Sequence, residues 1–243
     1  MLYLQVTKYE SNNKLEWDDF VKCSKNGHFF FYRDYMEYHS DRFQDFSLII
    51  YNDKGNIMAL LPASIDGDTV ISHGGLTFGG FVCDSKMTVA KMLDVFDNVK
   101  QFLKNAGVRI FIYKCMPAIY NKYPSDEALY ALFRNNAKLY RRDVSFSIYL
   151  PDRLPYRYTR KSEIKKGYKH QYSLHESSKY GEYIALLDKI LIKYHGNHPV
   201  HSADELRMLA EKFPNNIKLY TAEKNGRIEA GTVIFLQAGV VHT

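Results

Sequence analysis

The stretch FSLIIYNDKGNIMALLPASIDGDTVIS, residues 46–72, decides the fold predicted from this sequence. It contains three runs of β-type residues, 46–51, 57–65 and 69–72, which are separated by two short polar segments. The separators carry Gly55 and Gly67, and glycine supplies the positive φ that tight hairpin turns require. The stretch therefore predicts an antiparallel meander of three strands.

Helices and strands are predicted on both sides of this meander. Before it, residue alternation indicates one strand, and apolar residues at helical spacing indicate two helices. After it, a long apolar helical face ends at Gly107, a residue suited to the left-handed conformation that closes helices. The predicted order is β-α-α-β-β-β-α-β-α-β, with strands at 2–8, 46–51, 57–65, 69–72, 109–115 and 139–150 and helices at 15–21, 33–43, 89–106 and 126–135.

The second half of the chain repeats the first part of this order. The sequence SADE at 202–205 is a capping box that opens the second helix of the repeat, and Pro214 ends that helix. The order is again β-α-α-β-β-β, with strands at 170–174, 217–222, 228–236 and near 240 and helices at 183–194 and 202–213.

This repeat predicts an α/β (α+β) fold made of two related units with mixed, mostly antiparallel sheets. The expected domains are 1–150, a basic linker at 151–169, and 170–243. Because the sequence ends at Thr243 inside an apolar strand, we expect the second unit to be incomplete and the chain to be C-terminally truncated. The open sheet edge that would result favours pairing of two chains, so a homodimer is kept as an expectation.

Composition narrows the class of protein. The 243 residues are 46% hydrophobic and 15% aromatic, which is ample for a packed core. The N-terminus lacks a secretory signal pattern, and no apolar run approaches the ~20 residues of a membrane span, so we expect a cytoplasmic protein. The three cysteines have no CxxC spacing, which argues against a disulfide framework and a zinc site and favours reduced thiols.

Three segments resemble a bacterial branch of GNAT-type acyltransferases. They are ISHGGLTFGGFV at 71–82, IYNKYPSDEALYALFRNNAKLYRRDVS at 119–145 and HGNHPVHSADEL at 195–206. Two such units joined through a basic segment look like the FemAB-related transferases. The resemblance implies an N-acyltransferase that uses an activated acyl donor and binds no permanent cofactor, with acyl-CoA as co-substrate.

Two departures limit what this resemblance carries over. No helix sustains the heptads of the coiled-coil arm found in some peptidoglycan-bridge enzymes, which favours acyl-CoA over aminoacyl-tRNA as donor. GNAT enzymes also hold the donor pyrophosphate on a glycine-containing loop after the fourth strand. The segment at 74–85 lies at the equivalent place and carries Gly74, Gly75, Gly79 and Gly80, but lacks the arginine or glutamine that leads that motif and its spacing. It is therefore open to two interpretations, a phosphate cradle or a tight structural turn.

The basic segment TRKSEIKKGYKHQY, residues 159–172, is the strongest candidate for binding an anionic ligand. If it is helical, Arg160 and Lys161 lie one turn from Lys165, with Lys166 adjacent, and this cationic surface suits a phosphate or carboxylate. A solvated face is the equally weighted alternative. The net charge of +6 is too mild to indicate nucleic acid, so tRNA is expected only as a donor carrier.

Histidines supply the candidate proton acceptors. His195, His198 and His201 lie in one polar loop. Because histidine is the residue type whose ordinary pKa is near neutrality, each is a candidate general base for an attacking amine. A metal site is disfavoured, because the sequence shows neither a fourth ligand nor helical spacing. Further candidates for substrate binding in the first unit are His73, Gly74, Gly75, Tyr113 and Lys114.

The function predicted from these features is transfer of an acyl or aminoacyl group to an amine on a glycan or peptidoglycan precursor. The alternative is a non-catalytic binding module of the same fold, in which donor binding has been lost. No Ser-His-Asp order, Walker loop or dinucleotide fingerprint is visible in the sequence. That agrees with acyl transfer, where the donor is already activated.

Overall fold

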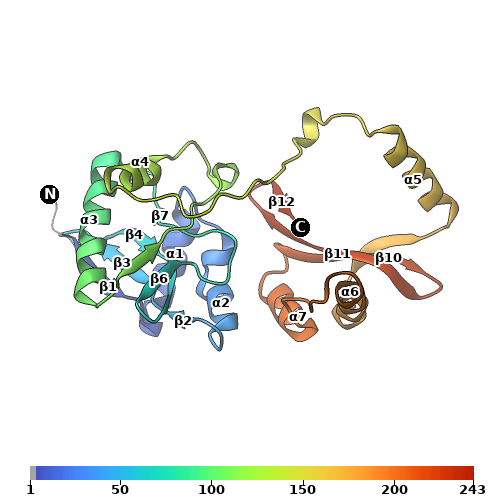
Figure 1. The fold of residues 1–243 in the computed structure, drawn as a ribbon, viewed down its shortest axis with the longest axis horizontal. Helices are drawn as coiled ribbons and strands as arrows, with labels where there is room; N and C mark the ends of the chain where they lie inside the picture. The colour runs from blue at the N-terminus through green and yellow to red at the C-terminus, as the bar shows by residue number, and fades with distance from the viewer. Residues whose placement is uncertain (1–3) are drawn as a thin grey trace. The chain divides into compact units, whose positions relative to one another are not determined.

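The computed structural model describes residues 4–243 and has a mixed α/β fold (Figure 1). The described residues form three four-stranded sheets whose strand pairs are mostly antiparallel, as the sequence predicts. The chain divides into two compact units. Unit 1 runs to residue 137 and includes 237–240, and unit 2 comprises 138–236 and 241–243. The expected domain limits, 1–150, 151–169 and 170–243, stay a prediction.

The described residues of unit 1 form two sheets and four α-helices. The first sheet has the order β1-β3-β4-β7 and the second the order β2-β5-β6-β8, in which β6 and β8 are parallel. The strands are β1 (Gln5–Lys8), β2 (Gln44–Asp45), β3 (Leu48–Tyr51), β4 (Ile57–Leu61), β5 (Ala63–Asp66), β6 (Thr69–Ser72), β7 (Val82–Cys83) and β8 (Ile110–Ile112). The helices are α1 (Lys14–Cys23), α2 (Arg33–Met36), α3 (Val89–Asn105) and α4 (Glu127–Arg134), with short 3-10 turns η1 (Ser11–Asn13), η2 (Phe29–Phe31), η3 (Glu37–His39) and η4 (Ala118–Tyr120).

The predicted meander forms, with one correction. Both hairpins are present, and Gly55 and Gly67 adopt positive φ values of 74° and 57° at their turns. The run 57–65, predicted as one strand, is divided at Pro62 into β4 and β5, which belong to different sheets. Proline cannot donate a hydrogen bond to a strand ladder, so the chain leaves one sheet at this residue and enters the next.

Helix α3 supplies much of the core of unit 1. Its buried face carries Met92, Val95, Phe96, Val99 and Leu103, which belong to one apolar cluster with residues of both sheets. Its end follows the prediction, because Gly107 has a φ of +79° and the Val108 amide donates to the Leu103 carbonyl at 2.9 Å. Helix α2 is shorter than expected. The chain passes from α2 into the 3-10 turn η3 instead of continuing as a helix to residue 43.

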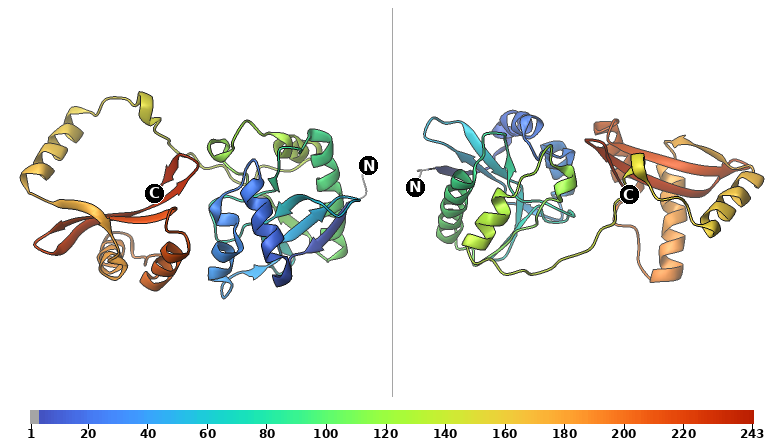
Figure 2. Two further views of the ribbon diagram at one scale, coloured as in Figure 1. Left: turned by 180° about the vertical axis from the view of Figure 1, so that it is seen from behind. Right: turned by 90° about the horizontal axis from the view of Figure 1, so that it is seen from above.

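Unit 2 is built on the third sheet, which has the order β12-β11-β10-β9. Helices α6 and α7 lie on one side of this sheet and α5 lies on the other (Figure 2). The apolar core under the sheet centres on Tyr180, Leu206 and Leu219. The elements are the 3-10 turn η5 (Leu150–Asp152), α5 (Tyr158–Lys169), β9 (Ser173–Ser177), α6 (Tyr180–His195), α7 (Ala203–Lys212), β10 (Ile217–Lys224), β11 (Arg227–Gln237) and β12 (Val240–His242).

Local signals in unit 2 are confirmed. The predicted capping box is present at α7, where Ser202 Oγ accepts from the Glu205 amide at 3.1 Å. In return, Glu205 Oε2 accepts from the Ser202 amide at 2.8 Å. The strand expected at 170–174 lies slightly later, at Ser173–Ser177, because α5 extends through Lys169.

The structural repeat is visible in order and in pairing. In each unit a first strand is followed by two helices and, after the short β2 in unit 1, by a strand that pairs with the first strand antiparallel, β1 with β3 and β9 with β10. In each unit the next pair is again antiparallel, β3 with β4 and β10 with β11. The two halves of the chain thus share the start of one topology.

The strand predicted at 139–150 is absent. Residues 137–149 have no regular secondary structure, and no strand of the described chain pairs with them. Their apolar side chains are exposed, with Phe146 at 95% and Val144 at 79%. The alternation of apolar and polar residues in this segment indicated a strand. A strand forms only where the edge of another strand is available to pair with it, and propensity does not supply that edge.

Two further properties follow from the structure. No helix among residues 4–243 combines the length and apolar character of a membrane span. The three cysteines are free thiols, as expected, with Cys83 buried and Cys23 and Cys115 exposed. Burial raises the pKa of the Cys83 thiol well above its ordinary value.

Candidate functional site

The glycine-rich segment 73–81 is a tightly packed loop in unit 1. Gly75 has a φ of +76°, and a Cβ there would lie 2.5 Å from the Phe43 ring. Gly80 has a φ of +86°, and a Cβ there would lie 2.6 Å from the Tyr113 hydroxyl. A Cβ at Gly74 would lie 2.0 Å from Ser64 Oγ. Close packing against the protein itself therefore explains these glycines, which favours the structural-turn interpretation.

Tyr113 and Lys114 hold this loop in place. They follow β8, and the Tyr113 hydroxyl accepts a hydrogen bond from the Phe81 amide at 2.9 Å. The Lys114 ammonium donates to the Leu76 carbonyl at 2.6 Å and approaches the His73 carbonyl at 3.4 Å. The structure thus brings together the first-unit residues predicted from the sequence, but as an internal scaffold for the loop.

His73 is a core residue. It is 2% exposed, its Nδ1 lies 2.9 Å from the Phe78 carbonyl, and its ring contacts the Phe31 ring at 5.0 Å between centroids. Burial lowers the pKa of His73 to about 3, so the imidazole is neutral at physiological pH. The structure therefore places His73, a substrate-binding candidate from the sequence, in the core of unit 1.

The predicted basic segment is largely the helix α5, in which no residue is buried. Arg160 pairs with Glu163 at 3.3 Å, and both side chains are more than 60% exposed at 65% and 63%. Lys161, Lys165 and Lys166 are exposed. The cationic surface is therefore present and solvated, and the C-terminal end of this helix leads directly into a pocket.

The three candidate histidines lie at the end of α6 and in the loop that follows. His195 is the last residue of α6. His198 Nδ1 lies 2.7 Å from Asp188 Oδ1, and His201 Nδ1 lies 4.0 Å from Glu205 Oε2. A carboxylate partner of this kind orients an imidazole ring. Within residues 4–243 no group of His, Cys, Asp and Glu side chains is placed to hold a metal ion.

A pocket of about 380 Å³ lies in unit 2 where α5 ends, β9 begins and the β10–β11 hairpin turns. Asn225 and Gly226 form the hairpin turn, with positive φ values of 51° and 76°. The pocket is rich in cationic and titratable side chains. Its lining residues are Lys169, His170, Gln171, Ser173, His175, Glu223, Lys224, Asn225 and Gly226.

Glu223 is the electrostatic centre of this pocket. Its side chain is only 9% exposed, and its Oε2 accepts from the Lys179 ammonium at 2.8 Å. The Thr221 hydroxyl donates to Oε1 at 3.2 Å, and His175 Nε2 lies 3.3 Å from the same oxygen. The hydrogen bond from Lys179 is the main cause that lowers the pKa of Glu223, so the carboxylate is ionised near neutral pH.

Sequence reasoning missed Ser173, His175 and Glu223. One signal was available, because Ser173 and His175 are two residues apart in a strand and so share a face. Glu223 could not be placed from its position in the sequence, since its neighbourhood depends on the register that sets it opposite Ser173. Only the fold brings these three side chains together.

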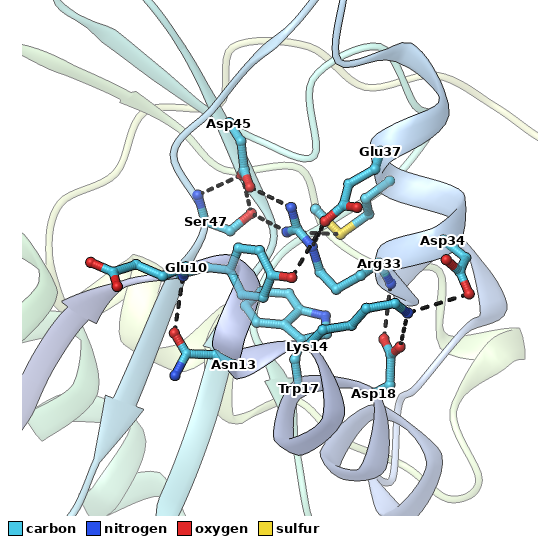
Figure 3. Close-up of polar contacts among 12 residues, drawn as sticks. Glu10, Asn13, Lys14, Trp17, Asp18, Arg33, Asp34, Glu37, Asp45 and Ser47 are labelled. Atoms are coloured by element: carbon cyan, nitrogen blue, oxygen red, sulfur yellow. Dashed lines mark hydrogen bonds and ion pairs between the residues drawn. The ribbon is translucent and has the colours of Figure 1, made fainter.

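A second polar cluster, around Arg33 in unit 1, is internally satisfied (Figure 3). The Arg33 side chain is 3% exposed and forms ion pairs with Glu37 and Asp45. Its Nη1 donates to Ser47 Oγ at 3.2 Å, and its guanidinium stacks 3.6 Å from the centroid of the Tyr9 ring. Because each guanidinium nitrogen has a partner within the fold, this cluster ties α2 to the start of β3 and is a structural element.

Comparison with known proteins extends this picture. No protein-family model and no curated protein sequence matches the chain. Among solved structures, the crystal structure of FemX matches with a TM-score of 0.52 and 12% sequence identity. The fold is FemX-like. The match covers 90% of this chain and 57% of the FemX chain, so this chain spans little more than half the length of FemX. At this identity the likeness establishes the fold, which is the FemAB-like fold expected from the sequence.

Proposed function

We propose that this protein is a transferase that moves an acyl or aminoacyl group from an activated donor to an amine on a glycan or peptidoglycan precursor. The observation that carries the proposal is the FemX-like fold, which extends over 90% of the chain. Acyl-CoA is the donor we favour, in agreement with the resemblance found in the sequence. Since fold alone does not define chemistry, the proposal needs a direct assay.

The charges of unit 2 support this proposal. An amine that attacks an activated acyl group must lose a proton, and histidine is the side chain best suited to accept it near neutral pH. His198 is the best oriented of the three candidate bases, because it is paired with Asp188 at 2.7 Å. The exposed cations of α5, Arg160, Lys161, Lys165 and Lys166, are the proposed contacts for the anionic part of a donor or acceptor.

A binding module without catalysis is the second candidate function. It is favoured by the packing of the glycine-rich loop, whose Gly75 and Gly80 lie against Phe43 and Tyr113. A loop filled by the protein's own rings offers little room for a donor pyrophosphate. The module would recognise a glycan or peptide through unit 2 and transfer nothing.

The two candidates differ in turnover. The purified chain is incubated with acetyl-CoA, with other acyl-CoAs or with aminoacyl-tRNA, together with an amino-sugar nucleotide or a lysine-containing peptidoglycan precursor. Mass spectrometry of the acceptor and release of free CoA report transfer. We expect H198N to lower the rate at least ~100-fold if His198 is the base, with H195N and H201N as matched comparisons. Binding of an acceptor without transfer from any donor would replace the first proposal with the second.

A further inference from the structure

Three side chains of the unit 2 pocket, Ser173, His175 and Glu223, form a continuous polar chain that ends at Lys179. Ser173 Oγ lies 3.3 Å from His175 Nδ1, and His175 Nε2 lies 3.3 Å from Glu223 Oε1. Glu223 Oε2 in turn accepts from the Lys179 ammonium at 2.8 Å. The order hydroxyl, imidazole, carboxylate is the order found in nucleophilic hydrolases, where a base activates a serine and a carboxylate orients the base.

The sheet register produces this arrangement. Strands β9 and β10 are antiparallel, with Ser173 directly opposite Glu223 and His175 directly opposite Thr221. Directly opposed residues of an antiparallel pair project from the same face of the sheet, as do residues two apart on one strand. Ser173, His175 and Glu223 therefore share one face with Thr221, and the regular backbone of the two paired strands fixes their spacing.

The buried carboxylate selects the imidazole tautomer that activation needs. Glu223 is ionised and can only accept hydrogen bonds, so a neutral His175 places its proton on Nε2, facing that carboxylate. The lone pair is then on Nδ1, the nitrogen that faces the Ser173 hydroxyl. Lys179 and Thr221 hold Glu223 from its other sides, which keeps the carboxylate in place.

The surroundings of Ser173 suit a reacting acyl group. Ser173 is exposed on β9, an outer strand of its sheet, and lines the pocket of about 380 Å³. Lys169 and Lys224 line the same pocket and carry positive charge. Positive charge near the reacting carbon stabilises the oxyanion that develops when a hydroxyl attacks an acyl group.

We propose that Ser173 is a nucleophile that takes an acyl group from an activated ester or thioester, with His175 as its general base and Glu223 as the residue that positions His175. In this step the Ser173 Oγ–carbonyl carbon bond forms, and the bond from that carbon to the leaving oxygen or sulfur breaks. The Ser173 proton passes to His175 Nδ1 and then to the leaving group. Water, activated by the same imidazole, hydrolyses the acyl-serine. This activity needs no amine acceptor and is separate from the proposed transfer.

The test uses the full chain and p-nitrophenyl acetate as the acyl donor. We expect a burst of p-nitrophenolate that approaches one equivalent per chain, with an acetyl group located by peptide mass spectrometry on Ser173. S173A should abolish both signals, and H175Q should lower the burst rate at least ~100-fold. E223Q should also lower the burst rate, because without the carboxylate the His175 proton is no longer held on Nε2. S173C should restore a nucleophile and be acetylated at the same position.

Controls separate this activity from background labelling and from misfolding. Ser178 is an exposed serine near Ser173 that does not line the pocket. The S178A chain should therefore react like the wild-type chain. Because Glu223 is buried, E223Q is compared by circular dichroism and by its melting curve before its rate is interpreted. Acetylation confined to lysine or tyrosine residues, or equal burst rates for the wild-type chain and S173A in a folded protein, would overturn the proposal. Neither result bears on acyl transfer to an amine, which the earlier assay measures.

Discussion

The Arg33 cluster allows a quantitative test of what holds unit 1 together. Arg33 is 3% exposed, and its substitution by alanine leaves the Glu37 and Asp45 carboxylates and the Ser47 hydroxyl without their cation. Removal of one partner from a buried ion pair costs about 3–5 kcal/mol. Glu37 and Asp45 are 46% and 37% exposed, so water can solvate both carboxylates. We therefore expect a loss near the lower limit, about 3 kcal/mol of unfolding free energy.

The assay is thermal and urea unfolding of the R33A chain. Since about 1 kcal/mol shifts the melting temperature of a domain of this size by roughly 2–4 °C, R33A should melt roughly 6–12 °C below the wild-type chain. R33K retains the charge but lacks the planar guanidinium that reaches several acceptors. Its melting temperature should therefore lie between those of R33A and the wild-type chain.

Arg109 provides the matched control. It lies in the same unit and pairs with Asp68 at 3.5 Å, but its side chain is 82% exposed. An exposed pair contributes less than about 1 kcal/mol, so R109A should melt within a few degrees of the wild-type chain. If R33A and R109A melted at the same temperature, the view of Arg33 as a buried structural tie would be refuted.

Three further predictions concern other parts of the fold. Because His73 is buried with its pKa lowered to about 3, only the unfolded chain takes up this proton between about pH 6.5 and pH 3, so stability should fall with falling pH by about 1.4 kcal/mol per unit. The H73F chain should lack this contribution to the pH dependence of stability. Urea unfolding midpoints of both chains across this pH range measure the difference. G80A should cost about 2 kcal/mol or more in urea unfolding, because it places a Cβ 2.6 Å from the Tyr113 hydroxyl at a φ of +86°. S202A should cost about 1 kcal/mol through loss of the α7 cap, and S202D, which keeps an acceptor, should restore most of it.

Features that depend on neighbouring residues could be predicted from the sequence. The hairpins with Gly55 and Gly67, the end of α3 before Gly107 and the capping box at Ser202 were all predicted. Each is specified within a few residues by φ preference or by a side chain that reaches its own backbone. Apart from the short strands β2 and β7, helix α5 and the absent strand at 139–150, the order of elements followed from these signals together with hydrophobic periodicity.

Features that depend on tertiary partners could not be predicted in this way. The sequence of the glycine-rich loop was compatible with a phosphate cradle or a structural turn. In the fold Phe43 and Tyr113 fill the space beside its glycines, which favours the turn. The run 139–150 has the alternation of a strand, but pairing needs an edge elsewhere in the chain. The Ser173–Glu223 neighbourhood required the β9–β10 register, which joins residues about fifty positions apart.

The uncovered segment 139–150 has a practical consequence for handling the protein. Within it the run VSFSIYL, residues 144–150, is free of charge, rich in β-formers and open to solvent. Short runs of this kind pair readily with copies of themselves, and the tendency grows with concentration. Samples of this chain should therefore be kept dilute and its light scattering followed over time. The substitution F146K should lower this self-association, because it adds a charge to the run. It should leave stability nearly unchanged, since the Phe146 side chain is 95% exposed.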